Sequence, residues 1–269
     1  MSRLSEIGFW RVAVVFGAIL QVAVPAIGTP LGLNVGRVSD QNPTLVTPAG
    51  YAFAIWTPIF LLCFVYAVYQ VLPSKRDDAF LGRIAPFAAL TFLANSVWEV
   101  LFPLRLFVPA QVLFAFIFAF AVIAHLLVQR RYDPQNRAHR WLAAPTFGLL
   151  SGWVTAAFLV GFATTFSGIG ELRTGFGAAL VGAGLLLLGG AVSTAVILAA
   201  RGGPVAGYGA YAVAVLWALV AVVVGQYDAS LLTTAAAVVA AVPVVIVLVD
   251  TGRRSGTRPT GRSPRPRVV

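Results

Sequence analysis

The stretch Leu90–Phe102, LTFLANSVWEVLF, places two polar side chains and an indole inside an otherwise apolar run. Asn95 and Glu99 are four residues apart, so on a helix they share one face, with Trp98 beside them. A carboxylate within an apolar span is costly unless it faces a protein interior, water or a partner. The stretch is therefore either a ligand site or a polar contact between helices.

Aromatic residues in other apolar runs extend this candidate site. Tyr51, Phe53 and Trp56 lie at the start of one run, and Trp153 lies within a later one. A Trp at the end of a span is usually an anchor in the membrane interface. Trp56, Trp98 and Trp153 lie within their runs, so an anchoring role does not account for them. A cavity walled by indoles with a few polar groups suits a flat, amphipathic ligand.

Few residues support other kinds of chemistry. Glu99 is the only acidic residue well inside a predicted span, so a pair of carboxylates for acid–base catalysis is absent. His125 lies near the end of an apolar run and His139 in a basic loop, where a single His is more often hydrogen-bonded or interfacial than a metal ligand. The only cysteine, Cys63, excludes an intrachain disulfide. The sequence predicts no catalytic residue, no metal site and no required cofactor, and an enzyme would have no recognisable motif of its own.

The composition predicts a membrane protein. Of the 269 residues, 59% are hydrophobic and only 10% are charged, whereas a soluble domain carries about a quarter charged residues. A spanning helix needs about 20 apolar residues, and eight runs of that kind occur, at about 9–27, 50–72, 84–102, 106–129, 141–162, 176–199, 205–224 and 231–249. These runs are too long and too continuous for the strands of a membrane β-barrel. We therefore predict an all-α integral membrane protein with about eight transmembrane helices.

The basic residues predict how the helices are oriented. Of the 19 Lys and Arg residues, 16 lie near the N-terminus, near alternate loops and in the C-terminal tail. The other three, Arg37, Arg105 and Arg173, lie in the intervening loops. By the positive-inside rule both termini are cytoplasmic, which requires an even number of spans. The net charge of +10 follows this topology, so we expect no nucleic-acid partner, and we expect a multi-pass protein surrounded by lipid in the plasma membrane.

Two segments lie outside the predicted helices. The 28–49 loop is the longest external one, and loops of this length usually carry function or are disordered. Glu99 is expected about one helical turn from the outer end of its span, near this loop. Residues 250–269 are rich in Arg, Pro, Gly and Ser and should form a disordered basic cytoplasmic tail. A cleaved signal peptide over residues 1–27 is a weaker alternative, because Arg11 interrupts the apolar start and no clear cleavage site follows.

Three segments, in the same order, resemble the TspO/MBR family, also called translocator proteins or tryptophan-rich sensory proteins. TPAGYAFAIWTPIF resembles the family's proline-aromatic entry into its second helix. NSVWEVLF resembles its third-helix Asn-x-x-Trp pattern, and LLSGWVTAA resembles its Trp-containing fifth helix. The resemblance covers about residues 8–165 and implies that residues 1–165 form a five-helix core. Residues 166–249 would then form three additional transmembrane helices.

The resemblance also implies a ligand pocket near the helix tops, with the 28–49 loop as its lid. Family members bind tetrapyrroles and, in some cases, sterols or drug-like molecules, so a porphyrin or haem is the implied ligand. The chain departs from the family pattern at Leu149, Leu150 and Gly161, where a Pro-Tyr pair and an Asn are usual. The residues expected to bind the ligand are Tyr51, Phe53, Trp56, Asn95, Trp98, Glu99 and Trp153.

Three hypotheses for function remain open at this point. The leading one is a ligand-binding protein with a sensory or regulatory role, in which a planar hydrophobic ligand stacks on Trp56 and Trp98. The alternative is a secondary transporter of a small amphipathic substrate that binds to Glu99 or Asn95. In the third, Asn95 and Glu99 only join helices, through hydrogen bonds worth about 0.6 kcal/mol and at most about 1–2 kcal/mol. The candidate partners are membrane lipid, a small hydrophobic ligand and a second copy of the chain in a homodimer.

Overall fold

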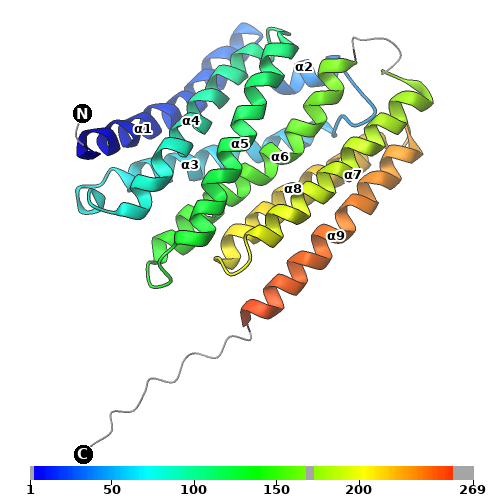
Figure 1. Ribbon diagram of the computed structural model, residues 1–269. Helices are drawn as coiled ribbons and strands as arrows, with labels where there is room; N and C mark the ends of the chain where they lie inside the picture. Colours follow the sequence, from blue (N-terminus) through cyan, green and yellow to red (C-terminus); the bar gives the residue numbers. More distant parts are fainter. Residues whose placement is uncertain (1–2, 168–172, 257–269) are drawn as a thin grey trace, which may run out of the picture.

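The computed structural model describes residues 3–167 and 173–256, and these residues contain nine α-helices and no strand (Figure 1). In chain order the helices are α1 (Arg3–Gly28), α2 (Val35–Gln41), α3 (Trp56–Gln70), α4 (Ala79–Leu101), α5 (Phe107–Arg131), α6 (Ala144–Phe166), α7 (Gly175–Ala199), α8 (Val205–Gln226) and α9 (Leu231–Gly256). All of them except the short α2 belong to the eight helical segments in these ranges that are long and apolar enough to cross a membrane. The prediction of an all-α membrane protein with eight spans is confirmed.

The N-terminal end of α4 lies five residues before the predicted start at 84. The Asp78 side chain accepts hydrogen bonds from the backbone N–H groups of Phe80 and Leu81, at 2.9 and 3.2 Å. A carboxylate in this position satisfies N–H groups that have no partner within the helix, so it fixes where the helix begins. The cap extends α4 into a stretch that hydrophobicity alone does not mark as helical.

The C-terminal end of α9 lies beyond the predicted end at 249. Residues 250–256 are helical, so the prediction of a disordered tail is wrong for these seven positions. Asp250 accepts from Arg254 at 2.9 Å, one helical turn later, and from Arg201 of the loop between α7 and α8 at 3.1 Å. These contacts join the last turn of α9 to the neighbouring loop. The remainder of the predicted tail, 257–269, lies outside the described residues.

The helices form one bundle with α1 and α9 on opposite sides (Figure 1). α1 packs on α3 and α4, and then α4, α5, α6 and α8 follow one another across the bundle, while α7 and α9 complete the far side. α6 and α8 approach each other closely, so a Cβ at Gly148 or Gly152 would collide with the backbone oxygen of Gly207 or Tyr211. Small residues at such crossings allow the close packing that holds helices together in lipid.

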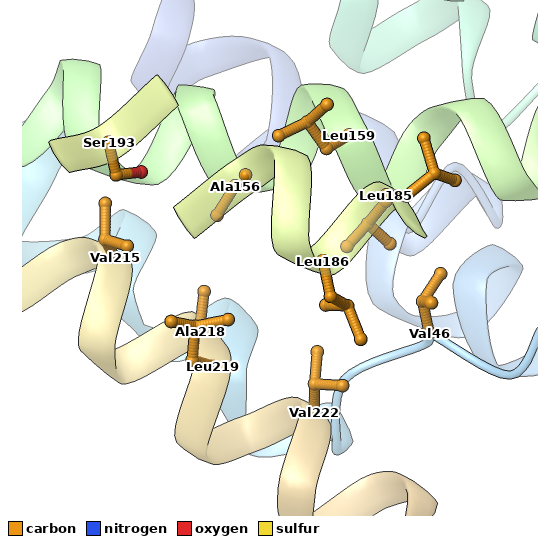
Figure 2. A pocket seen from close by; sticks show the side chains of 12 residues that line it. Val46, Ala156, Leu159, Leu185, Leu186, Ser193, Val215, Ala218, Leu219 and Val222 are labelled. Atoms are coloured by element: carbon orange, nitrogen blue, oxygen red, sulfur yellow. The ribbon is translucent and has the colours of Figure 1, made fainter. Parts of the chain in front are cut away.

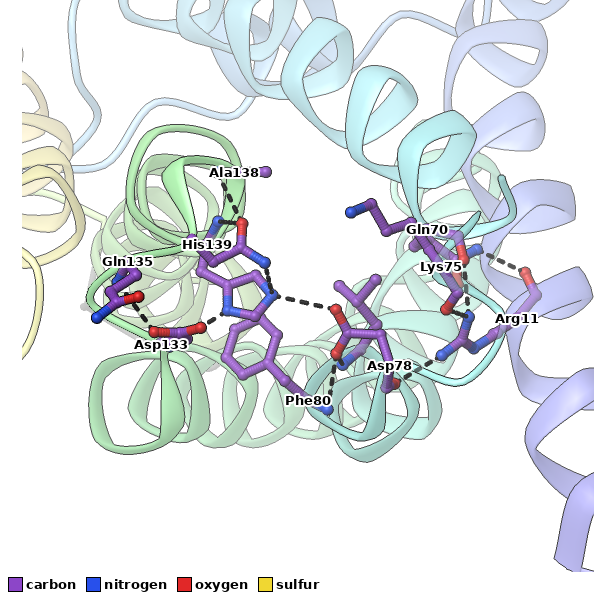
Figure 3. Close-up of polar contacts among 11 residues, drawn as sticks. Arg11, Gln70, Lys75, Asp78, Phe80, Asp133, Gln135, Ala138 and His139 are labelled. Carbon is purple, nitrogen blue, oxygen red and sulfur yellow. Dashed lines mark hydrogen bonds and ion pairs between the residues drawn. The ribbon is translucent and has the colours of Figure 1, made fainter. Parts of the chain in front are cut away.

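The two ends of the bundle differ in their polar residues. We call the end that carries residues 71–78, 132–138 and 200–204 the basic end, and the end that carries residues 28–55, 102–106 and 227–230 the loop end. At the basic end the buried Arg11 guanidinium donates to the backbone oxygens of Gln70, Lys75 and Asp78, at 3.0, 2.6 and 2.8 Å (Figure 3). Gln70 donates back to the Arg11 backbone oxygen at 2.9 Å. This network fixes α1 to the end of α3 and the start of α4.

A second contact at the basic end joins α4 to the helical turn that precedes α6. His139 Nε2 lies 3.3 Å from Asp78 Oδ2, and its ring stacks on Phe80 with 3.8 Å between the ring centroids (Figure 3). His139 Nδ1 accepts from the backbone N–H of Asp133 at 3.3 Å. The expectation that His139 is a hydrogen-bonded residue is confirmed.

Candidate ligand-binding site

Three neighbouring side chains near the C-terminal end of α4, at the loop end of the bundle, are all buried. Asn95, Trp98 and Glu99 are 0%, 8% and 6% exposed. Asn95 Nδ2 donates to Glu99 Oε1 at 3.2 Å, as their spacing of four residues predicts. Asn95 Oδ1 and Glu99 Oε2 have no hydrogen-bond partner in the described part of the chain. Because an unsatisfied buried polar atom costs about 1–3 kcal/mol, a ligand that supplies a donor at this position would be bound favourably.

Glu99 borders a cavity of about 440 Å³ at the loop end. This volume lies within the range of about 300–1,000 Å³ that is typical of small-molecule sites. The walls come from the end of α1, from residues 29–40, from the 3₁₀ turn at Gly50–Ile55 and from α3 and α4. Four aromatic side chains form much of the apolar wall, and besides Thr29 four side chains at its border are polar or charged. These residues are Phe53, Trp56, Phe60 and Trp98, and Asn34, Arg37, Asp40 and Glu99.

The aromatic rings around this cavity contact one another in series. Trp56 stacks on Phe60 with 5.0 Å between the ring centroids, and lies 6.5 Å from Trp98 at an interplanar angle of 38°. Trp153 meets Trp56 and Phe53 edge to face, at 6.1 and 6.2 Å. Such contacts stabilise the rings in fixed orientations, so the walls are preformed.

Trp153 borders a second cavity, of about 60 Å³, that adjoins the first. Phe53 and Trp98 border both cavities, so these two rings stand between them. A third space of about 30 Å³ lies between α6, α7 and α8, with Val46 of the 28–49 loop at one side (Figure 2). Its lining is apolar apart from Ser193. Ala156 borders both smaller cavities, so the three spaces follow one another from α4 to α7.

The structure brings together most of the predicted residues but not all of them. Phe53, Trp56, Trp98 and Glu99 border the main cavity, whereas Asn95 acts behind Glu99 through their hydrogen bond. Tyr51 borders neither of the two adjoining cavities; it is 44% exposed and packs on Trp217 with 5.3 Å between the ring centroids.

Several residues that border the main cavity were not among the predicted site residues, and Phe60, Asn34, Arg37 and Asp40 are four of them. Phe60 follows Trp56 by four residues, so helical periodicity could have identified it. Asn34, Arg37 and Asp40 belong to the 28–49 loop and reach the cavity because residues 35–41 form α2. The signal for that helix is Asn34, whose side-chain oxygen accepts from the Arg37 N–H at 2.8 Å and caps the first turn.

The 28–49 loop is held at the loop end by two parts of the chain. Arg105, in the tight turn between α4 and α5, donates to Gln41 Oε1 at 2.7 Å and to Asn42 Oδ1 at 3.3 Å. Its backbone φ of 60° is uncommon for a residue with a side chain. On the other side, α8 supplies the Ala221 backbone oxygen and the Gln226 side chain.

The contacts with α8 are made by the C-terminal part of the loop. The backbone N–H of Ala49 donates to the Ala221 oxygen at 2.8 Å, and Gln226 Nε2 donates to the Thr47 oxygen at 2.7 Å. A Cβ at Gly225 would lie 2.8 Å from the Thr47 oxygen, so glycine allows the loop to pass this close to the helix. The 28–49 loop therefore covers the cavity while it is bound to α8.

A family model described as TSPO-like protein matches residues 9–249. The chain belongs to the TSPO-like protein family. The resemblance predicted from the three motifs is confirmed, and the matched range also includes α7, α8 and most of α9. Comparison with curated proteins and with solved structures found no match. Membership supports a multi-pass membrane protein with a ligand-binding or transport-type function.

This TSPO-like protein has another unsatisfied polar side chain, away from the cavity. His125 on α5 is fully buried and stacks on Tyr211 of α8, with 5.4 Å between the ring centroids. Neither of its ring nitrogens has a hydrogen-bond partner in the ranges that the structure describes. The prediction of a hydrogen-bonded or interfacial His125 is wrong, because α8 packs over this part of α5 and its Tyr211 covers the ring.

Proposed function

We propose that this TSPO-like protein binds a planar hydrophobic ligand, of which a tetrapyrrole is an example, in the cavity beneath the 28–49 loop. The observation that carries the proposal is the combination of indole walls, Trp56 and Trp98, with the unsatisfied Glu99 Oε2. The rings provide flat apolar surface, and the carboxyl group accepts a hydrogen bond from the ligand's polar part. Binding would serve a sensory or regulatory role.

The proposed orientation places this cavity on the outer side of the plasma membrane. The basic end, with Lys75, Arg76, Arg130 and Arg131, would face the cytoplasm under the positive-inside rule. Both termini would then be cytoplasmic, and a ligand would approach the 28–49 loop from outside or from the outer leaflet.

The proposal is tested by titrating protoporphyrin IX into the purified protein in lipid nanodiscs. We expect Trp emission to be quenched with a saturable dependence on porphyrin. A double variant, Trp56→Ala with Trp98→Ala, should weaken binding about tenfold or more, because each aromatic contact is worth about 0.5–1.5 kcal/mol beyond the area that it buries. Affinity is best read from the porphyrin absorbance, since the variant also removes two fluorophores.

A matched control is Trp141→Ala, which removes an indole that is 65% exposed and precedes α6 at the basic end. This variant should bind protoporphyrin IX as the wild type does. Equal affinity of the wild type and the double variant would refute binding between Trp56 and Trp98.

A transport role is a second candidate, and the series of adjoining cavities favours it. A route from the main cavity past Phe53 and Trp98 would continue between α6 and α8, through spaces of about 60 and about 30 Å³ that would have to widen. Ala156 borders both spaces, so Ala156→Phe should block uptake of the porphyrin into proteoliposomes while leaving equilibrium binding intact. Absence of uptake by the wild type would remove this candidate.

A further inference from the structure

We infer that the main cavity selects a ligand that carries an aromatic ring system and a cationic nitrogen, and that the Glu99 carboxylate pairs with that nitrogen. The inference rests on the proposed function and adds the charge of the ligand and the residue that selects it. A tetrapyrrole offers pyrrole N–H donors to Glu99, which satisfies the hydrogen bond but supplies no positive charge.

The first observation is the burial of Glu99 relative to the other charged groups. Three charged side chains border the cavity in the described ranges: Arg37, Asp40 and Glu99. Arg37 and Asp40 are exposed, so solvent and salt screen their fields. Glu99 is 6% exposed, and its interactions within the cavity are screened much less. An ionised Glu99 therefore gives this site a buried negative charge.

The second observation is that Glu99 has no positive partner in the described part of the chain. The ion pairs found there involve Asp78 and Asp250, and Glu99 is in none of them. Its one hydrogen bond comes from the neutral amide of Asn95, on Oε1. Oε2 is buried without a partner at the border of the cavity. A buried carboxylate is stabilised by a counter-charge, and the cavity is where a bound ligand can supply one.

The third observation is the type of ring beside Glu99. Trp98 precedes it on α4, and Trp56 and Phe60 form the adjoining wall. A cation within about 6 Å of an indole centroid is attracted to the ring face, and Trp is the most favourable of the aromatic residues. Indole walls therefore favour the same charge that the carboxylate favours. An anionic ligand group near Glu99 would be repelled by it.

The test compares two small ligands that differ in charge and little in shape: 2-naphthylmethylamine, which is protonated at pH 7, and 2-naphthylmethanol. Binding to the full chain in nanodiscs is measured by titration calorimetry, with empty nanodiscs subtracted. We expect the wild type to bind the ammonium ligand about tenfold more tightly than the alcohol, a difference of about 1.4 kcal/mol. Glu99→Gln should abolish that preference and leave the affinity for the alcohol within about twofold, since the side chains have nearly the same shape.

The control is Asp77→Asn, which removes the same charge from an exposed position at the basic end. It should leave the preference for the ammonium ligand unchanged. The comparison of the two ligands on the wild type needs no variant, so the inference is testable even if Glu99→Gln does not fold.

The outcomes separate the inference from the proposed function. If protoporphyrin IX binds in a manner that depends on Trp56 and Trp98, but the wild type does not prefer the ammonium ligand, the inference is overturned and the proposed function stands. A preference that survives Glu99→Gln also overturns the inference. If protoporphyrin IX and both naphthyl ligands fail to bind, the proposed function and the inference fall together.

Discussion

At the scale of single residues, His125 gives the clearest test of the packing between α5 and α8. Replacing His125 by Phe keeps a ring against Tyr211 and removes two nitrogens that lack a partner in the described ranges. An unsatisfied buried polar atom costs about 1–3 kcal/mol, so His125→Phe should raise the melting temperature in detergent by several degrees. His125→Ala should lower it, because the substitution leaves a cavity. A lower melting temperature for His125→Phe would show that the imidazole has a stabilising partner.

Residue-level prediction from sequence succeeded where helical periodicity applies. The Asn95–Glu99 hydrogen bond follows from a spacing of four residues on one helix. Tyr51 could not be placed in the same way, because residues 50–55 form a 3₁₀ turn before α3 and Tyr51 packs on Trp217. The burial of His125 depends on α8, and no local pattern in the sequence indicates which helix packs against α5.

At the scale of helices, the contact between α6 and α8 requires glycine on α6. A Cβ at Gly152 would collide with the Tyr211 backbone oxygen and lie 3.0 Å from the Ala214 Cβ. Because the obstacle is backbone, Gly152→Ala must separate the two helices, and overpacking of this kind costs about 1–3 kcal/mol. Gly209→Ala is the matched control on α8, since its Cβ meets no atom within 4 Å. We expect a lower melting temperature for Gly152→Ala only; equal changes in both variants would contradict a close contact between the two helix backbones.

The eight spans could be predicted because lipid requires about 20 apolar residues for each crossing. Their ends could not, since they depend on individual polar contacts: Asp78 caps α4, and Arg254 and Arg201 bind Asp250 on α9. The helical part of the 28–49 loop is another such case. α2 has only seven residues, and its start depends on the Asn34 cap.

At the scale of the whole molecule, helices far apart in the sequence build one site. The cavity is formed by α1, the 28–49 loop, the turn at Gly50–Ile55, α3 and α4. The loop is also hydrogen-bonded to α8, where Gln226 follows its partner Thr47 by 179 residues. Trp217 of α8 donates to the Ala52 backbone oxygen at 3.0 Å, which fixes the turn after the loop as well. The later helices therefore contribute to the site by holding its cover and not by lining the main cavity.

This arrangement predicts that a change in α8 alters how long a ligand stays bound. Gln226→Leu removes the donor to the Thr47 oxygen and leaves that oxygen unsatisfied, at a cost of about 1–3 kcal/mol to the closed position of the 28–49 loop. We expect protoporphyrin IX to dissociate about tenfold faster, while its association rate changes much less, as is usual for variants of one interface. Stopped-flow fluorescence in nanodiscs gives both rates.

The matched control is Gln70→Leu, which removes a similar hydrogen bond at the basic end, the one to the Arg11 backbone oxygen at 2.9 Å. Both variants should lower the melting temperature, because each loses a buried hydrogen bond, but only Gln226→Leu should change the dissociation rate. If Gln70→Leu accelerated dissociation equally, the effect would come from general destabilisation of the bundle, and α8 would have no particular role in retaining the ligand.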